Sequence, residues 1–134
     1  MAVKRVAPEE AKDLMDQGYA YLDVRSIPEF EAGHPTGAYN VPLLHMGAAG
    51  MTPNPDFVAV VQKRFPADAK LVVGCKAGGR SAKAAALLEA VGYTNLADQR
   101  AGFDGNPQEA GWRPKGLPTA TTADPARTYE SLKA

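Results

Sequence analysis

Apolar residues recur with the period of a helix in two parts of the chain. In residues 8–17, Ala11, Leu14 and Met15 lie on one side, while the acidic residues lie elsewhere. Residues 81–91 show the pattern most strongly, with apolar side chains at positions i, i+3, i+4 and i+7. We therefore predict an amphipathic helix over each segment, ended by the glycine that follows it.

Short apolar runs lie between the helical segments. Residues 19–24 and 70–74 are rich in aliphatic or aromatic side chains, which predicts buried strands. Weaker strand patterns cover residues 38–42 and 94–97. Because strands and helices alternate with short connections, the sequence predicts an α/β fold, with a central, mainly parallel β-sheet and helices on both faces.

Capping and turn residues mark the remaining segments. Ser26 and Glu29 have the spacing of a capping box, in which the two residues satisfy each other's free amides at the start of a helix. Asn54 can cap a further helix. Residues 47–55 are rich in Gly, Pro and Asn and predict a loop, and a last turn or helix is expected around residues 108–111.

The length of the chain, 134 residues, fits one domain. We expect residues 1–118 to form that domain. Residues 119–134 are polar and poor in aliphatic side chains, which indicates either a flexible tail or a short helix. In the helical alternative, Asp124 caps a helix that presents Tyr129 and Leu132.

Charge and hydropathy argue against several classes of function. The 15 Lys and Arg residues balance the 15 Asp and Glu residues, so there is no general electrostatic reason to bind nucleic acid or an anionic membrane. No uncharged apolar run approaches the roughly 18 residues of a membrane span, and the N-terminus lacks the apolar stretch of a secretory signal. We therefore expect a cytoplasmic protein without nucleic-acid or membrane partners.

Cysteine and histidine are scarce in the chain. It has one cysteine, Cys75, and two histidines, His34 and His45. One cysteine cannot form an intramolecular disulfide, a Cys-x-x-Cys redox pair or a thiolate zinc site, and two histidines argue against a purely histidine metal site. Cys75 is therefore either a buried core residue or an isolated reactive group.

The stretch around Cys75, LVVGCKAGGRS, favours the reactive alternative. Gly78 and Gly79 allow successive backbone N–H groups to turn toward one point, and the N-terminus of the next helix adds its partial positive charge there. Lys76 and Arg80 bring full positive charges close by. Together these groups predict that the pKa of Cys75 lies below its usual value of about 8.5, so that the residue is a thiolate at neutral pH.

An anion-binding loop around a thiolate suits two reactions, phosphoryl transfer through a cysteinyl phosphate and sulfur transfer through a persulfide. Arg80 ends the loop, where its guanidinium can bind an oxyanion with two hydrogen bonds, whereas Lys76 is equally compatible with a solvated surface position. Four residues separate Cys75 from Arg80, while cysteine phosphatases and related arsenate reductases have five. The shorter loop leaves less room for a tetrahedral oxyanion on the sulfur and favours sulfur transfer.

Two signatures, in the right order, resemble the rhodanese (thiosulfate sulfurtransferase) family. CKAGGRS is similar to that family's Cys-x-x-Gly-x-Arg-Ser, and the upstream LDVRSIPEFEAGHPTGAYNVP is similar to its Leu-Asp-Val-Arg and Gly-His signature. With MGAAGMTPNPDF and GYTNL, the likeness is strongest to the single-domain rhodaneses of plants, including the senescence-associated type. It covers roughly residues 8–118, and so identifies residues 1–118 as a single rhodanese-like domain.

The resemblance implies an activity for Cys75. Its thiolate would attack the outer sulfur of thiosulfate, sulfite would leave, and the persulfide would pass its sulfur to cyanide or a thiol. The implied partners are therefore a small anionic donor and a thiol or cyanide acceptor, with a protein acceptor also possible, and no cofactor. We expect a monomer or weak homodimer. A non-enzymatic sulfur carrier or regulatory module, and a phosphatase or arsenate reductase, stay as alternatives.

The resemblance also implies roles for the surrounding residues. Arg80 would hold the donor, and Ser81 would cap the helix and brace the loop. Asp23 and Arg25 would support the structure around the site, and His34 would form a structural hydrogen bond instead of acting as a base. The active-site loop as a whole comprises Lys76, Ala77, Gly78, Gly79, Arg80 and Ser81.

The late part of the chain departs from the family pattern. Two glycines and an aromatic residue, soon followed by Trp, are common in the family, whereas this chain has Ala101 before Gly102 and Phe103, and its only Trp at Trp112. Arg100, directly before this segment, is also unusual. We consider two consequences, an altered pocket wall and an additional charge from Arg100 at the donor site.

Overall fold

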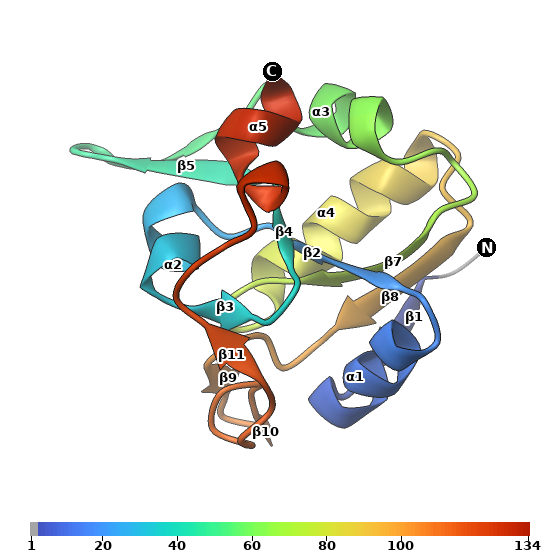
Figure 1. The fold of residues 1–134 in the computed structure, drawn as a ribbon, viewed down its shortest axis with the longest axis vertical. Coiled ribbons are helices and arrows are strands. Elements are labelled where there is room, and N and C mark those ends of the chain that lie inside the picture. The colour runs from blue at the N-terminus through green and yellow to red at the C-terminus, as the bar shows by residue number, and fades with distance from the viewer. Residues whose placement is uncertain (1–2) are drawn as a thin grey trace.

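Five strands form the central sheet of the computed structural model, which describes residues 3–134 (Figure 1). Every neighbouring pair in this sheet is parallel, so the predicted α/β fold with a parallel central sheet is confirmed. In spatial order, the strands are β1 (Lys4–Val6), β8 (Asn95–Gln99), β7 (Lys70–Gly74), β2 (Ala20–Asp23) and β4 (Tyr39–Asn40).

Helices cover both faces of this sheet (Figure 1). Side chains alternate along the strands, so Tyr21 and Val72 pack against α1 and α2 on one face, while Leu22 and Val73 pack against α3, α4 and α5 on the other. Within the described residues, no helix has the length and apolar character needed to cross a membrane. The helices are α1 (Pro8–Asp16), α2 (Ile27–Ala32), α3 (Phe57–Arg64), α4 (Gly79–Ala90), α5 (Tyr129–Lys133) and the 3₁₀ turn η1 (Pro125–Arg127).

Two short hairpins occupy segments that the sequence predicted as a loop and as a turn or helix. β5 (Leu44–Gly47) and β6 (Gly50–Pro53) form a hairpin that projects from the body of the domain (Figure 1). The sequence prediction was wrong here because β6 is fully exposed and so has no alternation of buried and exposed residues. β9 (Gly105–Asn106) and β10 (Glu109–Ala110) pair near the predicted last turn.

Asn54 does not cap α3, which begins at Phe57 with Asp56 at its N-cap. Asn54 is buried instead, and its Nδ2 donates hydrogen bonds to the carbonyl of Pro42 and the hydroxyl of Tyr129. Its Oδ1 accepts from the amide of Asp56. The side chain therefore joins two distant segments, which a local capping pattern does not reveal.

The C-terminal segment folds back over the domain. Strand β11 (Thr119–Ala120) pairs antiparallel with β3 (His34–Pro35), and η1 and α5 follow. Tyr129 and Leu132 are buried in the core cluster beneath α5. Of the two alternatives that the sequence left for residues 119–134, the structure contains the short helix, because these two apolar side chains attach it to the core.

Candidate active site

The loop that carries Cys75 lies at the carboxyl end of β7, between that strand and the start of α4. β7 is the middle strand of the five, flanked by β2 and β8. Ligand clefts of parallel sheets form at this edge. The strand, loop and helix are therefore arranged as the sequence predicted, although α4 begins two residues earlier, at Gly79.

The Cys75 sulfur lies beneath the first turn of α4. The residue is 2% exposed, and its Sγ accepts a hydrogen bond of 3.0 Å from the amide of Gly78. Gly78 has a positive φ of 110°, and a side chain there would place its Cβ 2.2 Å from the carbonyl oxygen of Arg100. Only glycine fits this position, so the close packing of the loop against Arg100 fixes the amide that points at the sulfur.

A chain of buried polar groups continues from the sulfur. The Cys75 Sγ lies 3.6 Å from the Ser81 hydroxyl oxygen, which lies 2.6 Å from Oδ1 of Asp98. A hydroxyl has one hydrogen, and the carboxylate is the stronger acceptor, so Ser81 donates to Asp98 and can accept from a Cys75 thiol. Arg5 Nε donates to the other oxygen of Asp98, at 3.1 Å. Ser81 thus contacts the Cys75 sulfur directly, and Asp98 contacts it only through Ser81.

The role predicted for Ser81 from the sequence was only partly correct, and Asp98 was not predicted at all. Ser81 lies in the first turn of α4 and does not cap the helix, because Gly78 occupies the N-cap position. Asp98 belongs to β8 and is almost completely buried. An isolated acidic residue inside an otherwise buried strand was the signal available in the sequence, since buried carboxylates require partners.

Arg80 is held by Glu29. Its two terminal guanidinium nitrogens donate to the two oxygens of the Glu29 carboxylate, at 2.7 and 3.0 Å. Burial alone would raise the pKa of Glu29, but hydrogen bonds from Arg80 and Ser26 outweigh it and lower this pKa to about 2. The same hydrogen bonds to Glu29 raise the pKa of Arg80. The guanidinium that was expected to hold the donor is therefore already paired.

Asp23 and Arg25 form a buried ion pair beside the loop, with Arg25 Nη2 2.8 Å from Asp23 Oδ2. Asp23 pairs in register with Gly74, the last residue before Cys75. Burial alone would lower the pKa of Arg25, but the hydrogen bonds and charge of Asp23 outweigh it and raise this pKa. Arg25 also donates to the carbonyl of Gly33 and lies over the Phe103 ring. The pair therefore lies next to the end of β7, the strand that leads into the loop.

Two pockets flank the loop. One, of about 350 Å³, includes Lys76, together with Arg25, Glu29 and Arg113. The other, of about 720 Å³, is lined by Ala77, Gly78 and Gly79 and by residues of the β9–β10 region. Lys76 forms no ion pair in the part of the chain described here, while Arg113 is paired with Asp104. The first pocket therefore offers an unpaired cation beside Cys75.

Three further residues lie where they do not contact the sulfur. His34 stacks on Phe30, and its Nδ1 lies 2.8 Å from the Phe30 carbonyl, which is the structural hydrogen bond that was expected. Arg100 pairs with Glu109 at 2.8 Å, so its charge is not directed at the Cys75 sulfur. Trp112 is fully buried against Tyr21 and belongs to the core. Among residues 3–134, no group of three His, Cys, Asp or Glu side chains is placed to bind a metal.

Comparison of the sequence with known proteins gives a consistent result. The family model described as Rhodanese-like domain matches residues 7–105. "Thiosulfate sulfurtransferase 16, chloroplastic" from Arabidopsis thaliana is 43% identical over 81% of this chain and 86% of its own length. "Senescence-associated protein DIN1" from Raphanus sativus is 38% identical over 69% of this chain, which spans about half, 51%, of that relative.

Solved structures show the same architecture. The crystal structure of Rv0390 from M. tuberculosis superposes with a TM-score of 0.77 and covers 91% of this chain and all, 100%, of the other. The two sequences are 24% identical, so this similarity concerns the fold.

Proposed function

Because the chain belongs to the rhodanese-like domain family, we propose that it is a thiosulfate sulfurtransferase in which Cys75 carries the transferred sulfur. The observation that carries this proposal is the position of the Cys75 sulfur, which accepts the Gly78 amide at the N-terminus of α4. Amide donors and a helix N-terminus stabilise the anionic form of a thiol. A relative that is 43% identical carries the name thiosulfate sulfurtransferase, which supports the same activity here.

The reaction has two steps, and both keep the charge on sulfur. The Cys75 thiolate attacks the outer sulfur of thiosulfate, a new S–S bond forms, and the S–S bond of thiosulfate breaks. Sulfite leaves with that bond's electron pair, and the terminal persulfide sulfur carries the negative charge. Cyanide or a thiolate then attacks the terminal sulfur and leaves as thiocyanate or a persulfide, which restores the Cys75 thiolate.

The loop residues have separate tasks in this proposal. The Gly78 amide and the first turn of α4 stabilise the negative sulfur, and Gly79 lines the larger pocket beside the loop. Lys76, which lines the pocket next to the loop, supplies the charge that attracts a dianionic donor. Arg80, paired with Glu29, fixes the far end of the loop and acts on the donor only if that pair opens.

Mass spectrometry provides the direct test. Incubation with thiosulfate is expected to add about 32 Da, one sulfur atom, to Cys75, and cyanide or dithiothreitol is expected to remove it. The Cys75→Ser variant is the control and should gain no mass. Absence of the adduct in the parent protein would overturn the proposal.

Turnover distinguishes this enzyme from the alternatives. Repeated formation of thiocyanate from thiosulfate and cyanide, lost in Cys75→Ser, supports an enzyme, whereas a single persulfide without turnover supports a dedicated sulfur carrier. Hydrolysis of an aryl phosphate that orthovanadate inhibits would instead support phosphoryl chemistry. The four-residue spacing between Cys75 and Arg80 argues against that outcome.

A further inference from the structure

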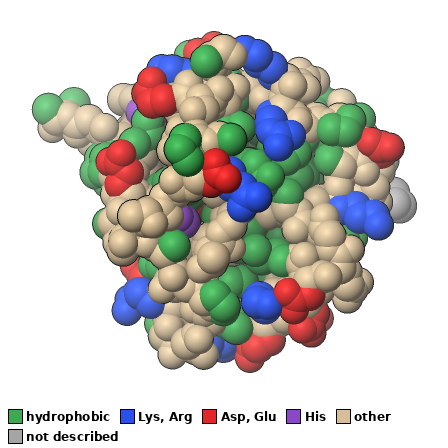
Figure 2. Space-filling view, in the orientation of Figure 1, with side chains coloured by type: hydrophobic (Ala, Val, Ile, Leu, Met, Phe, Trp, Pro, Cys, Tyr) green, Lys and Arg blue, Asp and Glu red, His purple; other side chains and the backbone are tan. Residues whose placement is uncertain are grey.

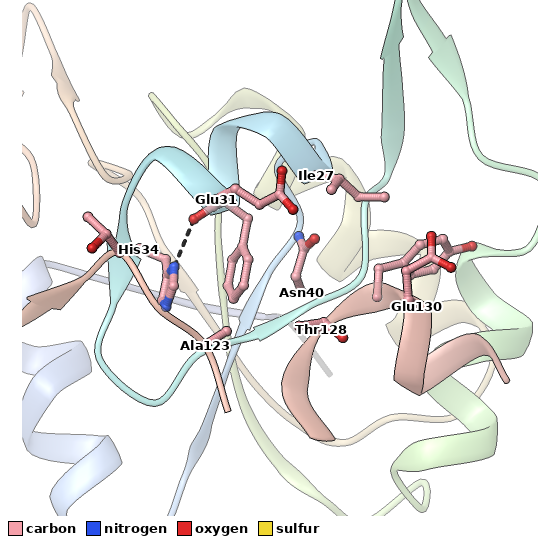
Figure 3. Close-up of a pocket in the computed structure, with 10 residues that line it drawn as sticks. Ile27, Glu31, His34, Asn40, Ala123, Thr128 and Glu130 are labelled. Atoms are coloured by element: carbon pink, nitrogen blue, oxygen red, sulfur yellow. Dashed lines mark hydrogen bonds between the residues drawn. The ribbon is translucent and has the colours of Figure 1, made fainter. Parts of the chain in front are cut away.

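A cavity of about 290 Å³ lies between α2 and the C-terminal segment (Figure 3). Ile27 and Phe30 form its apolar wall on the side of α2, and Ala123 and Tyr129 face them from the C-terminal segment. The volume is at the lower end of the range of ligand pockets, which begins at about 300 Å³. None of its lining residues belongs to the Cys75 loop or to the two pockets beside it.

The C-terminal wall lies outside the part of the chain that the family model matches. The rhodanese-like family model ends at residue 105, and this wall comes from residues 121–130. The segment is held at its start by the pairing of β11 with β3. Its other end is attached to the core by the buried Tyr129. The cavity therefore lies between the part of the chain that the family model matches and the C-terminal segment.

Two buried hydrogen-bond acceptors open into the cavity. Asn40 is 1% exposed, and its Nδ2 donates to the carbonyls of Asp23 and Arg25, while Oδ1 has no hydrogen-bond partner within the described residues. His34 is 2% exposed, and its Nδ1 must carry a hydrogen because it faces a carbonyl oxygen that can only accept. Whenever the ring carries only that hydrogen, the other nitrogen, Nε2, is an acceptor, and it has no hydrogen-bond partner among residues 3–134.

Both acceptor atoms have some accessible surface, and both residues line the cavity. Across residues 3–134, no side-chain nitrogen or oxygen is both fully enclosed and without a hydrogen-bond partner. Asn40 Oδ1 and His34 Nε2 are therefore accessible, and both residues line the cavity. Figure 3 shows the His34 ring near Ala123, and Asn40 between α2 and Thr128. Buried acceptors of this kind require a donor from a ligand or from water.

The charge of the cavity wall is negative. Glu31 from α2 and Glu130 from α5 stand at its rim, and the wall contains no Lys or Arg (Figure 3). Lys133 lies 3.6 Å from Glu130, but this pair is exposed and compensates the charge only weakly. A ligand that complements this wall carries hydrogen-bond donors, a positive charge and a short apolar body.

We propose that the cavity binds a small organic ammonium ion. Its N–H groups donate to Asn40 Oδ1 and His34 Nε2, and the carboxylate of Glu31 attracts its charge. Its apolar body lies against Ile27 and Phe30. Such a site is separate from the Cys75 loop and does not depend on sulfur transfer.

The probe is benzylammonium, titrated into the full-length ¹⁵N-labelled chain and followed through the amide chemical shifts. Saturable shifts are expected in residues 27–34 and 121–130, and none in residues 75–81. Benzyl alcohol has the same size without the charge, and we expect it to bind about tenfold more weakly. Shifts that do not saturate, or equal binding of the alcohol, would overturn the proposal.

Two variants test the walls without removing a buried polar group. Ala123→Leu fills the cavity and should weaken benzylammonium binding at least about tenfold, whereas Ala126→Leu, outside the cavity on η1, should bind like the parent. Glu31→Gln should weaken binding about threefold, and Asp68→Asn, elsewhere on the surface, should not.

The Cys75→Ser variant should bind benzylammonium like the parent. The binding test is therefore independent of the test of sulfur transfer. Unchanged binding in Ala123→Leu would overturn the proposal.

Discussion

Buried polar groups on the two sides of α2 differ in how completely they are hydrogen-bonded. On the side that faces the Cys75 loop, Glu29 binds both terminal nitrogens of Arg80, and the other buried polar groups there are also paired. On the side that faces the cavity, His34 and Asn40 each keep one acceptor open. The same short helix thus separates a closed polar network from an open one.

The difference corresponds to two kinds of task. A loop that must hold an anionic sulfur in one position gains from a network in which every member has its partner, because unpaired buried groups allow rearrangement. A binding cavity must leave acceptors unpaired, since a ligand supplies the missing donors. Substitutions in the paired network on the loop side should therefore change sulfur transfer and stability together, while those on the cavity side should leave sulfur transfer unchanged.

The largest effect is expected from Gly78→Ala. The new Cβ would lie 2.2 Å from the Arg100 carbonyl oxygen, and φ is positive there, so we expect a loss of about 3 kcal/mol in the free energy of unfolding and a large fall in kcat. Urea denaturation and thiocyanate formation measure the two. Gly79→Ala is the matched control, because nothing lies within 4 Å of its Cβ position. Equal effects of the two variants would contradict the argument.

Leu132→Ala should have the second-largest effect. It should lower stability without changing sulfur transfer. The side chain belongs to α5, is buried in the core and is not part of the Cys75 loop, and its truncation should cost about 2 to 3 kcal/mol of unfolding free energy. The kcat of the folded variant should stay within about twofold of the parent, which corresponds to less than about 0.5 kcal/mol. Leu87→Ala, an exposed position on α4, is the control for stability.

Glu29→Gln should have an intermediate effect that includes the chemistry. Arg80 would lose its charged partner while it stays largely buried, so we expect a loss of about 1 to 2 kcal/mol. Because the guanidinium is then free to bind anions, the KM for thiosulfate should change along with stability. Steady-state kinetics on the purified variant would show this, and an unchanged KM would limit Arg80 to a structural role.

Low pH should reduce the free energy of unfolding of the parent protein, because it protonates the Glu29 carboxylate. The folded-state pKa of Glu29 is about 2, below the value of about 4.3 expected in the unfolded chain. Its contribution to stability is therefore complete above about pH 4.3 and is lost as the pH falls toward about 2. Urea denaturation across this range should show a shallower pH dependence in Glu29→Gln, and identical slopes would contradict the assignment.

The smallest effect on stability is expected from Lys76→Ala. The side chain is exposed and forms no ion pair in the described chain, so the unfolding free energy should change by less than about 0.5 kcal/mol. The KM for thiosulfate should nevertheless rise about threefold, since a nearby unpaired charge is lost. Lys83→Ala, exposed on α4, removes the same charge farther along the helix and should leave KM unchanged.

Local patterns in the sequence predicted the parts of the fold that depend on neighbours in the chain. Residues 70–74, the loop and the helix after it lie as expected, because apolar runs and paired glycines act over a few residues. The β5–β6 hairpin was missed because most of its side chains are exposed, and β1 is too short for a visible pattern.

The contacts that define the site were less visible, because they join distant segments. Glu29 and Arg80 are 51 residues apart, and Ser81 and Asp98 are 17 apart. Nothing in the sequence linked the members of either pair. Glu29 was predicted only as part of a capping box, and the structure shows that it has this role as well. The cavity needs residues from α2 and from the C-terminal segment, so no single stretch of sequence could indicate it.

The sheet is bounded by its two shortest strands. β1 has three residues and β4 has two, so little unpaired backbone remains at either border for another chain to join. Lys4 and Arg5 stand exposed on β1, where a second copy would meet like charges. Both borders of the sheet thus have the short strands that limit edge-to-edge pairing between sheets.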